Sequence, residues 1–309
     1  MRQALIRSLC HLAAHDERIV LLTGDLGYMV MEPFRDRFPT RFFNVGVAEQ
    51  NMIGIASGLA EAGLRPYCYS IAPFASLRPF EFIRNGPVLQ RLPVRIVGMG
   101  MGFDYGHAGP SHYAIEDIAV MRALPGMAIV VPADSQQAAV AIQATAGIDG
   151  PIYYSLSKED RLTVPNLNGR FEPGRIQIVQ SGADVALISI GSISTEVLTA
   201  AELLSSAGVE ATVAIVSGFN PDPARDIAEL LAGFRFAVSV EAQVISGGLG
   251  SFISTVIATE GLACRLRILA VRESPDGTSG GQTERWRKYG LDRASIVRAA
   301  LETTGRNPQ

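Results

Sequence analysis

Cysteine is rare in this sequence, which has three among its 309 residues. Cys10, Cys68 and Cys264 lie far apart and form no C-x-x-C pair, which argues against both a disulfide framework and a zinc site. Two of the four histidines, His11 and His15, stand four residues apart on a predicted first helix, a spacing that can hold zinc. A solvated helix face explains this pair more simply, so we expect no metal site in this chain.

Long apolar runs and an excess of one charge are also missing. The longest apolar stretches, such as Ala183–Ile190, are strand-sized, whereas a membrane-spanning helix needs roughly 20 apolar residues. The start of the chain carries Arg2 and Arg7 in an amphipathic pattern without the apolar block of a secretory signal, so we expect a cytoplasmic protein. Its 27 basic residues balance 30 acidic ones, and no basic run is interleaved with aromatic residues. We expect neither a membrane nor a nucleic acid as a partner.

The chain does have enough apolar material for a large core. Hydrophobic residues make up 48% of it and charged residues 18%, which excludes disorder as its main character. At roughly 100 to 200 residues per domain, the length favours two domains.

Short β-branched runs alternate with helical patterns through the first half, which predicts a parallel α/β sheet. The segment Leu162–Gly174 concentrates Pro, Gly and Asn without periodicity and separates this block from a second one. The fold class we predict is α/β with two parallel-sheet domains, residues 1–165 and residues 175–309. In the first half, strands are expected at Ile19–Leu22, Phe42–Asn44, Arg65–Tyr69, Val94–Gly98 and Ala128–Val131, and helices at Gln50–Glu61, Phe80–Leu89 and Ser135–Ala146. In the second, strands are expected at Val185–Ile190, Glu210–Val216, Phe236–Glu241 and Arg265–Val271, with helices at Ser194–Ala207, Asp222–Leu231, from Gly250, and at Asp292–Glu302.

The first candidate for chemistry is Asn44–Met52, where a strand ends and a small-residue helix begins with Glu49 in its opening turn. A carboxylate gains there from the helix N-terminus, and simple capping is one interpretation. The other is a buried carboxyl group that shares its proton with a ligand nitrogen. The spacing alone leaves both open.

Glycines and histidines follow the predicted fourth strand. Gly98–Gly102 lacks the third glycine of a dinucleotide-binding fingerprint, and a polar loop follows it in place of a helix. We interpret this segment as a strand that opens into a loop at the carboxyl edge of the sheet, where open α/β sheets bind ligands. His107 and His112 stand on that loop, either as solvated side chains or as ligand contacts.

Two further segments have alternative interpretations. Phe74–Phe80 places aromatic residues on a loop after a strand, where they either pack in the core or stack on a flat heterocycle. Ser246–Ser251 is either an anion-binding turn at a helix start or a set of glycines that permits close packing, and we favour packing.

Taken together, these segments resemble the C-terminal two thirds of a transketolase, from about Arg2 to Glu302. The resemblance implies a pyrimidine-binding domain for thiamine diphosphate followed by the transketolase C-terminal domain. The family's diphosphate domain, which holds Mg²⁺, has no counterpart in this sequence. A separate N-terminal subunit is therefore implied, with the cofactor at the seam between two polypeptides and an α2β2 heterotetramer as the usual assembly. The matching motifs are Thr23–Leu26, Gly46–Met52, the aromatic segment around Phe74, Gly109–His112 with Ile115–Asp117 downstream, and Leu124–Met127.

The resemblance also implies roles for residues on the cofactor side. Glu49 matches the glutamate that hydrogen-bonds the aminopyrimidine ring, which lets the cofactor's own exocyclic nitrogen remove the thiazolium C2 proton. Phe74 matches the aromatic residue that packs on the pyrimidine, with Phe80 as the second choice. Asp25 matches an acidic residue near the pyrimidine.

On the substrate side, His112 matches the histidine of the family's Gly-Pro-Thr-His motif and faces bound substrate, with His107 on the same loop. Arg2 is in register with an arginine on the phosphate side. Ala108 stands where transketolases carry an acidic residue that contacts a substrate hydroxyl. Gly100 and Val131 stand where they carry a histidine and an arginine that hold the phosphate of the acceptor. Because a phosphate without charge-assisted partners binds poorly, we do not expect an ordinary pentose phosphate as the acceptor.

The leading hypothesis is thus a two-subunit transketolase-like enzyme that moves a two-carbon ketol unit from a ketose to an aldehyde. Similarity of Val240–Gly250 to the β subunits of pyruvate dehydrogenase-type enzymes supports an alternative, delivery of a two-carbon acyl group to a lipoyl or acyl carrier protein. A deoxyxylulose-phosphate-synthase-like activity is a weaker alternative. A non-catalytic assembly subunit is the alternative from a different functional class.

Overall fold

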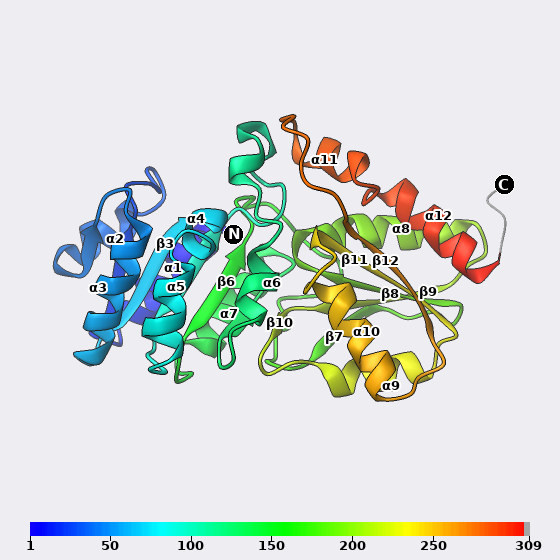
Figure 1. The fold of residues 1–309 in the computed structure, drawn as a ribbon, viewed down its shortest axis with the longest axis horizontal. Helices are drawn as coiled ribbons and strands as arrows, with labels where there is room; N and C mark the ends of the chain where they lie inside the picture. The colour runs from blue at the N-terminus through cyan, green and yellow to red at the C-terminus, as the bar shows by residue number, and fades with distance from the viewer. Residues whose placement is uncertain (306–309) are drawn as a thin grey trace.

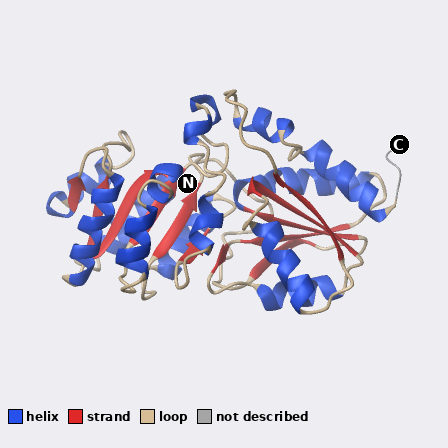
Figure 2. Ribbon diagram, in the orientation of Figure 1, coloured by secondary structure: helices blue, strands red, loops and turns tan. Residues whose placement is uncertain are grey.

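Two sheets organise the chain, each with helices on both faces (Figure 1, Figure 2). The structure is a computed structural model and describes residues 1–305. The predicted fold class, two mostly parallel sheets with flanking helices, is confirmed. Within residues 1–305, no helix combines the length and apolar character needed to cross a membrane.

The first sheet has seven strands in the order β10-β5-β6-β4-β3-β1-β2. Its central strands are buried on both faces and rich in β-branched and aromatic residues, as expected for parallel strands covered by helices. The strands are β1 (Ile19–Thr23), β2 (Phe42–Asn44), β3 (Arg65–Ile71), β4 (Arg95–Met99), β5 (Ala128–Val130), β6 (Ile152–Leu156) and β10 (Gly218–Phe219).

Helices of the first half fall into two groups by their contacts: α1 packs on α2 and α7, whereas α3 packs on α5 and α4 on α6. The Asp134 side chain caps α7 by accepting from the Gln137 backbone N–H. The helices are α1 (Arg2–Ala13), α2 (Glu32–Arg37), α3 (Glu49–Glu61), α4 (Ala72–Ser76), α5 (Phe80–Ile83), α6 (Asp117–Arg122) and α7 (Ser135–Thr145), with a π-helical turn η2 (Arg84–Val88) and the 3-10 turns η1 (Pro39–Arg41), η3 (Gly106–Ala108) and η4 (Pro110–His112).

The second sheet has five strands in the order β12-β11-β8-β9-β7, with α8 and α12 on one face and α9 and α10 on the other (Figure 1). The strands are β7 (Ile176–Gln180), β8 (Val185–Ile190), β9 (Ala211–Val216), β11 (Phe236–Val244) and β12 (Arg265–Val271). The helices are α8 (Ser194–Ser206), α9 (Ala224–Ala232), α10 (Leu249–Thr259), α11 (Gln282–Lys288) and α12 (Arg293–Thr304), with the 3-10 turn η5 (Gly191–Ile193) before α8.

The expectation that all strands run parallel is wrong at two edges. β7 pairs antiparallel with β9, and β10 pairs antiparallel with β5. β7 was not predicted because it follows directly on the Pro- and Gly-rich segment, and β10 is only two residues long. Through β10, the second half of the chain contributes a strand to the first sheet. An added Cβ at Gly218 would lie 2.2 Å from the Ile129 carbonyl oxygen, so this close pairing requires glycine. The boundaries at residues 165 and 175 stay a prediction, and the last part of the second range lies outside the described residues.

Four neighbouring strands of the first sheet place the candidate residues together. In the order β4-β3-β1-β2, each strand runs parallel to the next, so their carboxyl ends meet at one edge. The register aligns Thr23 with both Asn44 and Tyr69, so the loops after β1, β2 and β3 start at nearly the same level. These ends lead to Asp25, Glu49 and Phe74, and to the loop after β4 that carries His107 and His112, here called the histidine loop. This edge is where open α/β sheets bind ligands.

Candidate functional site

Glu49 is the fully buried acid at the centre of this edge. It begins α3, is 0% exposed, and accepts a hydrogen bond from Ser70 Oγ at 2.9 Å through Oε1. Its Oε2 accepts from Arg78 Nη1 at 2.6 Å, which makes an ion pair. An added Cβ at Gly24 would lie 3.4 Å from Oε1, so the turn after β1 lies against the carboxylate. Glu49 thus points inward to a small polar cluster and not to bulk water.

Phe74 stands beside this cluster on α4. Its ring is half-buried, with the Arg78 guanidinium carbon 4.5 Å from the ring centroid and the His112 ring centroid 5.1 Å away, edge-on. Phe80, by contrast, begins α5 and packs half-buried on the core of the first sheet. Of the two predicted aromatic residues, Phe74 is therefore the one that stands among the polar site residues.

Asp25 lies on the exposed loop between β1 and α2 with a left-handed backbone, φ 59°. Its Oδ1 accepts hydrogen bonds at 2.8 Å from Asn44 Nδ2 and from the Tyr28 hydroxyl. These donors, Asn44 first, lower the pKa of Asp25 below its ordinary value. Asp25 therefore ties its loop to the end of β2. It directly follows Gly24, which lies against the Glu49 carboxylate.

The histidine loop follows β4, as predicted. His112 is half-buried and lies between Phe74 and Tyr105, whose ring centroid is 6.3 Å away. Its Nδ1 is 2.9 Å from the Ser111 hydroxyl. His107 is exposed at the tip of the loop, so the structure brings only His112 into contact with Phe74. A Cβ at Gly100 would lie 2.2 Å from the Tyr105 ring, so this ring fills the space where a side chain at position 100 would stand.

Arg2 reaches the same region from the start of α1. Its Nε donates to the Lys158 carbonyl oxygen at 3.1 Å and lies 4.0 Å from Asp160. The Lys158 ammonium in turn stands 4.7 Å from the Tyr105 ring centroid. Arg2 is thus connected to the histidine loop through Lys158 and Tyr105.

The second half of the chain holds the histidine loop in position. The Gly280 N–H donates to the Gly106 carbonyl oxygen at 3.1 Å, and the Tyr113 hydroxyl donates to the Thr278 carbonyl oxygen at 2.8 Å. The Phe103 ring stacks on that of Tyr289 with centroids 5.1 Å apart. The position of the histidine loop therefore depends on both halves of the chain.

A buried acid lies under the loop at the start of α6. Asp117 is 1% exposed, and its Oδ2 accepts from the Tyr153 and Ser155 hydroxyls at 2.8 Å each. Burial raises the pKa of Asp117 to about 6, against the opposing effect of these donors. This network anchors α6 to β6 beneath the site.

The glycine-rich segment Ser246–Ser251 binds the chain's own carboxylate. Glu241 is fully buried and accepts from the backbone N–H groups of Leu249 and Gly250 at 2.7 and 2.8 Å. Burial raises the pKa of Glu241 to about 7. An added Cβ at Gly248 would lie 2.0 Å from Glu241 Oε2, so the glycine permits close packing, and the N–H groups at the start of α10 also bind an anion, the chain's own carboxylate; both interpretations of this segment therefore apply. These two donors of the turn therefore have an internal partner in Glu241.

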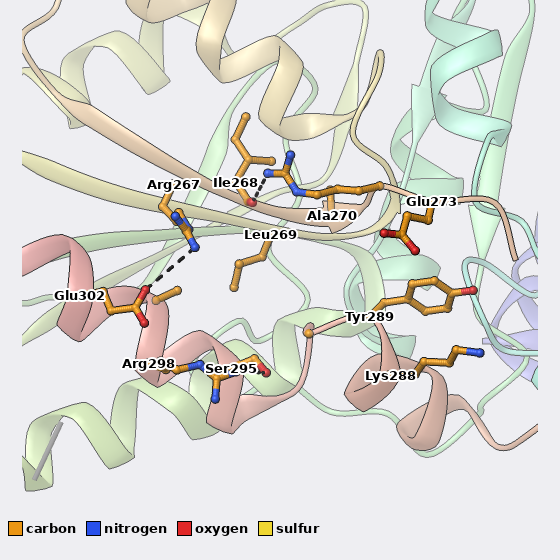
Figure 3. A pocket seen from close by; sticks show the side chains of 13 residues that line it. Arg267, Ile268, Leu269, Ala270, Glu273, Lys288, Tyr289, Ser295, Arg298 and Glu302 are labelled. Atoms are coloured by element: carbon orange, nitrogen blue, oxygen red, sulfur yellow. Dashed lines mark hydrogen bonds and ion pairs between the residues drawn. The ribbon is translucent and has the colours of Figure 1, made fainter. Parts of the chain in front are cut away.

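A cleft of about 360 Å³ lies elsewhere, between the edge strand β12 and helices α11 and α12 (Figure 3). Its basic side chains include Arg267, which faces Glu302 at 3.9 Å, and Arg272, which donates to the Ile268 carbonyl oxygen at 3.0 Å. None of the predicted site residues lines it. Within residues 1–305, no group of three or more His, Cys, Asp or Glu side chains is arranged to hold a metal ion.

Sequence reasoning missed Arg78, Ser70 and Lys158. Arg78 lies within the Phe74–Phe80 segment, which was interpreted for its aromatic residues alone, and a charged residue four positions after Phe74 was the available signal. Ser70 is the last residue but one of the buried strand β3, and Lys158 lies two residues after β6; no motif marks either of them.

Comparison with known proteins gives consistent matches along most of the chain. Residues 1–161 match the model of the transketolase pyrimidine-binding domain, and residues 174–296 match that of the transketolase C-terminal domain. A protein of Methanocaldococcus jannaschii named as a transketolase C-terminal section is 36% identical over 305 residues, covering 98% of this chain and 95% of that protein. A 6-deoxy-6-sulfo-D-fructose transketolase subunit of Clostridium sp. (strain MSTE9) is 33% identical and covers 99% and 95%. A solved structure described as a split gene transketolase, inactive beta4 tetramer, is 32% identical with a TM-score of 0.86, covering 99% of this chain and 98% of that one.

Proposed function

Because this chain belongs to the transketolase family, with its pyrimidine-binding and C-terminal domains, we propose that it is the C-terminal subunit of a two-component, thiamine diphosphate-dependent transketolase. The reaction is transfer of a two-carbon ketol unit from a ketose to an aldehyde acceptor. The observation that carries this proposal is the buried Glu49 carboxylate beside Phe74 and His112 at the carboxyl edge of the first sheet.

The residues at this edge fit the pyrimidine half of the cofactor. Glu49 offers its Oε2 oxygen, which is paired with the partly exposed side chain of Arg78. Phe74 offers a ring face next to the same guanidinium group. When bound, thiamine diphosphate supplies a thiazolium ring as nucleophile and electron sink. Glu49 holds a proton between Oε2 and a ring nitrogen, Phe74 packs on the ring, and Asp25 holds the loop beside Gly24 on the rim. Mg²⁺ and the diphosphate fall to the partner subunit.

His112 serves the substrate side. Its half-buried ring next to Phe74 can donate a hydrogen bond to an oxygen of a bound sugar, and Ser111 orients its Nδ1. We assign His107, exposed on the same loop, and Arg2, which donates to the Lys158 carbonyl oxygen, to the distal end of a substrate.

The acceptor is a sugar other than an ordinary pentose phosphate. The Tyr105 ring occupies the space where a side chain at position 100 would stand, and Ala108 and Val131 carry no charge. Both observations support a site without the charged residues that usually hold the acceptor phosphate. A relative named for 6-deoxy-6-sulfo-D-fructose supports a modified sugar in this group of split proteins.

The surface of the first half supports a partner subunit. Along α3, Gly54, Ile55 and Gly58 are exposed, and among residues 1–305 a Cβ at either glycine would meet nothing within 4 Å beyond the backbone of its own helix. On the adjoining α5 and η2, Phe82 is 44% exposed and Leu89, one residue beyond η2, is 74% exposed. Small residues and exposed apolar side chains next to Glu49 suit a helix from the diphosphate-binding subunit, in an α2β2 assembly.

Co-purification with the product of a neighbouring gene tests this proposal. We expect the pair, and neither chain alone, to retain thiamine diphosphate and to form a new ketose from a ketose donor and an aldehyde. Acylation of a lipoyl or acyl carrier protein in place of ketose formation would favour the alternative activity. A pair that associates but retains no cofactor at millimolar concentration would instead indicate an assembly subunit.

A further inference from the structure

Arg78 makes both contacts that the proposed function assigns to the aminopyrimidine ring. Its guanidinium donates to Glu49 Oε2 at 2.6 Å, and the same planar group lies 4.5 Å from the centroid of the Phe74 ring. A flat group with N–H donors at its edge, stacked on Phe74 and bonded to Glu49, has the shape and the polarity of the expected heterocycle.

We propose that Arg78 is an internal occupant of the pyrimidine site, an arginine latch that must leave Glu49 before the cofactor binds. The latch consists of Arg78, Glu49 and Phe74. This inference rests on the proposed function, since it concerns how the same site is kept closed in the free subunit.

The burial of the two partners shows which one moves. Glu49 is 0% exposed and is fixed at the start of α3, with Ser70 as a second partner on Oε1. Arg78 is 39% exposed and follows α4 on the short connection to α5. Within residues 1–305, Glu49 is the only carboxylate paired with Arg78. Arg78 can therefore swing to solvent by rotating its own side chain, whereas Glu49 cannot.

The latch also explains how a buried carboxylate is tolerated without the cofactor. An ionised acid away from water is costly unless it is paired and hydrogen-bonded, and Arg78 supplies that pairing until a ligand replaces it. The same pairing reduces cofactor affinity, because the apparent dissociation constant rises in inverse proportion to the fraction of open sites. One charge-assisted hydrogen bond to a buried carboxylate favours the closed site over the open site by about ten- to a hundred-fold.

The test is calorimetric titration of thiamine diphosphate, with Mg²⁺ present, into the complex of this chain with its partner subunit. We expect Arg78→Ala to bind the cofactor about ten- to a hundred-fold more tightly than the wild-type complex. Arg37→Ala is the matched control, because Arg37 is also exposed and stacked on a phenylalanine, Phe38 at 5.2 Å, and has no ion pair with a carboxylate among residues 1–305. Its affinity should equal that of the wild type.

Equal or weaker binding by a folded Arg78→Ala complex overturns the latch, although the proposed function survives if the wild type binds. Failure of every complex to bind the cofactor counts against the proposed function itself. If Arg78→Ala does not fold, the structure of the wild-type complex with the cofactor decides. Arg78 displaced from Glu49 Oε2 supports the latch, and Arg78 still bonded there refutes it.

Discussion

The exposed glycines of α3 allow one prediction in which stability and assembly change in opposite directions. Gly54→Ala and Gly58→Ala each add a methyl group to the interior of α3, where the described residues place nothing within 4 Å of the new Cβ beyond the backbone of α3 itself. Glycine is less favourable than alanine in a helix interior by about 1 kcal/mol, so the double variant should gain about 2 kcal/mol as an isolated subunit. For a domain of this size, that gain corresponds to a rise of about 4 to 8 °C in the melting temperature.

In the proposed complex, the same two methyl groups stand where another helix packs. Overfilling a packed contact costs about 1 to 3 kcal/mol, which corresponds to roughly a 5- to 150-fold loss in association constant. Differential scanning fluorimetry of the isolated chain and a titration of the partner subunit measure the two effects. Thr255→Ala, on the exposed side of α10, is the control and should leave association unchanged. A double variant that melts higher and still associates with wild-type affinity would refute the assignment of this face to the partner.

Three further predictions concern the buried acids and the histidine loop. Glu49→Gln should lower turnover by two or more orders of magnitude while subunit association measured by gel filtration stays intact, and an unchanged rate would remove Glu49 from the mechanism. His112→Gln should lower turnover by about 10²- to 10³-fold with cofactor affinity unchanged in the same titration, because one donor to the substrate is lost; a loss of cofactor binding alone would contradict this role. Asp117→Asn concerns stability. Burial raises the pKa of Asp117 from 3.8 to about 6, so the wild type loses stability as the pH rises from about 4 through 6, and above that it carries the full cost of a buried charge. That rise corresponds to about 2 to 3 kcal/mol. Urea unfolding should therefore show the asparagine variant as more stable at pH 8 and nearly equal to the wild type at pH 4; equal stability at both pH values would show that the pKa of Asp117 is the same in the folded and the unfolded chain, as for a well-solvated carboxyl group.

Much of the fold was predictable because its signals are local. Runs such as Ile19–Leu22 and Val185–Ile190 are β-branched and bounded by turn residues, and the strands observed there differ from the predicted ones by one residue at most. The weak edges were not predictable. β7 and β10 depend on the pairing partner, and the two-residue β10 has no sequence signature of its own.

The candidate site shows the same division. Glu49, Phe74 and His112 follow strand ends, and the parallel topology brings them together. Arg78 was missed because its role arises from side-chain geometry: nothing in Phe74–Phe80 indicates that a guanidinium turns back to Glu49. The partners that hold the histidine loop, Gly280 and Thr278, lie more than 160 residues away in the chain, beyond the reach of local patterns.

The short strand β10 has a consequence for any attempt to express the first half alone. Gly218 and Phe219 complete the edge of a sheet otherwise built from the first 156 residues, and Phe219 belongs to the same apolar cluster as the core of that sheet. A fragment that stops at residue 165 would expose the free backbone of β5 and lose the covering ring of Phe219. We expect such a fragment to self-associate through that edge. Shortening this protein therefore calls for a cut that keeps Gly218 and Phe219 attached, even though they are remote in sequence from the strand they protect.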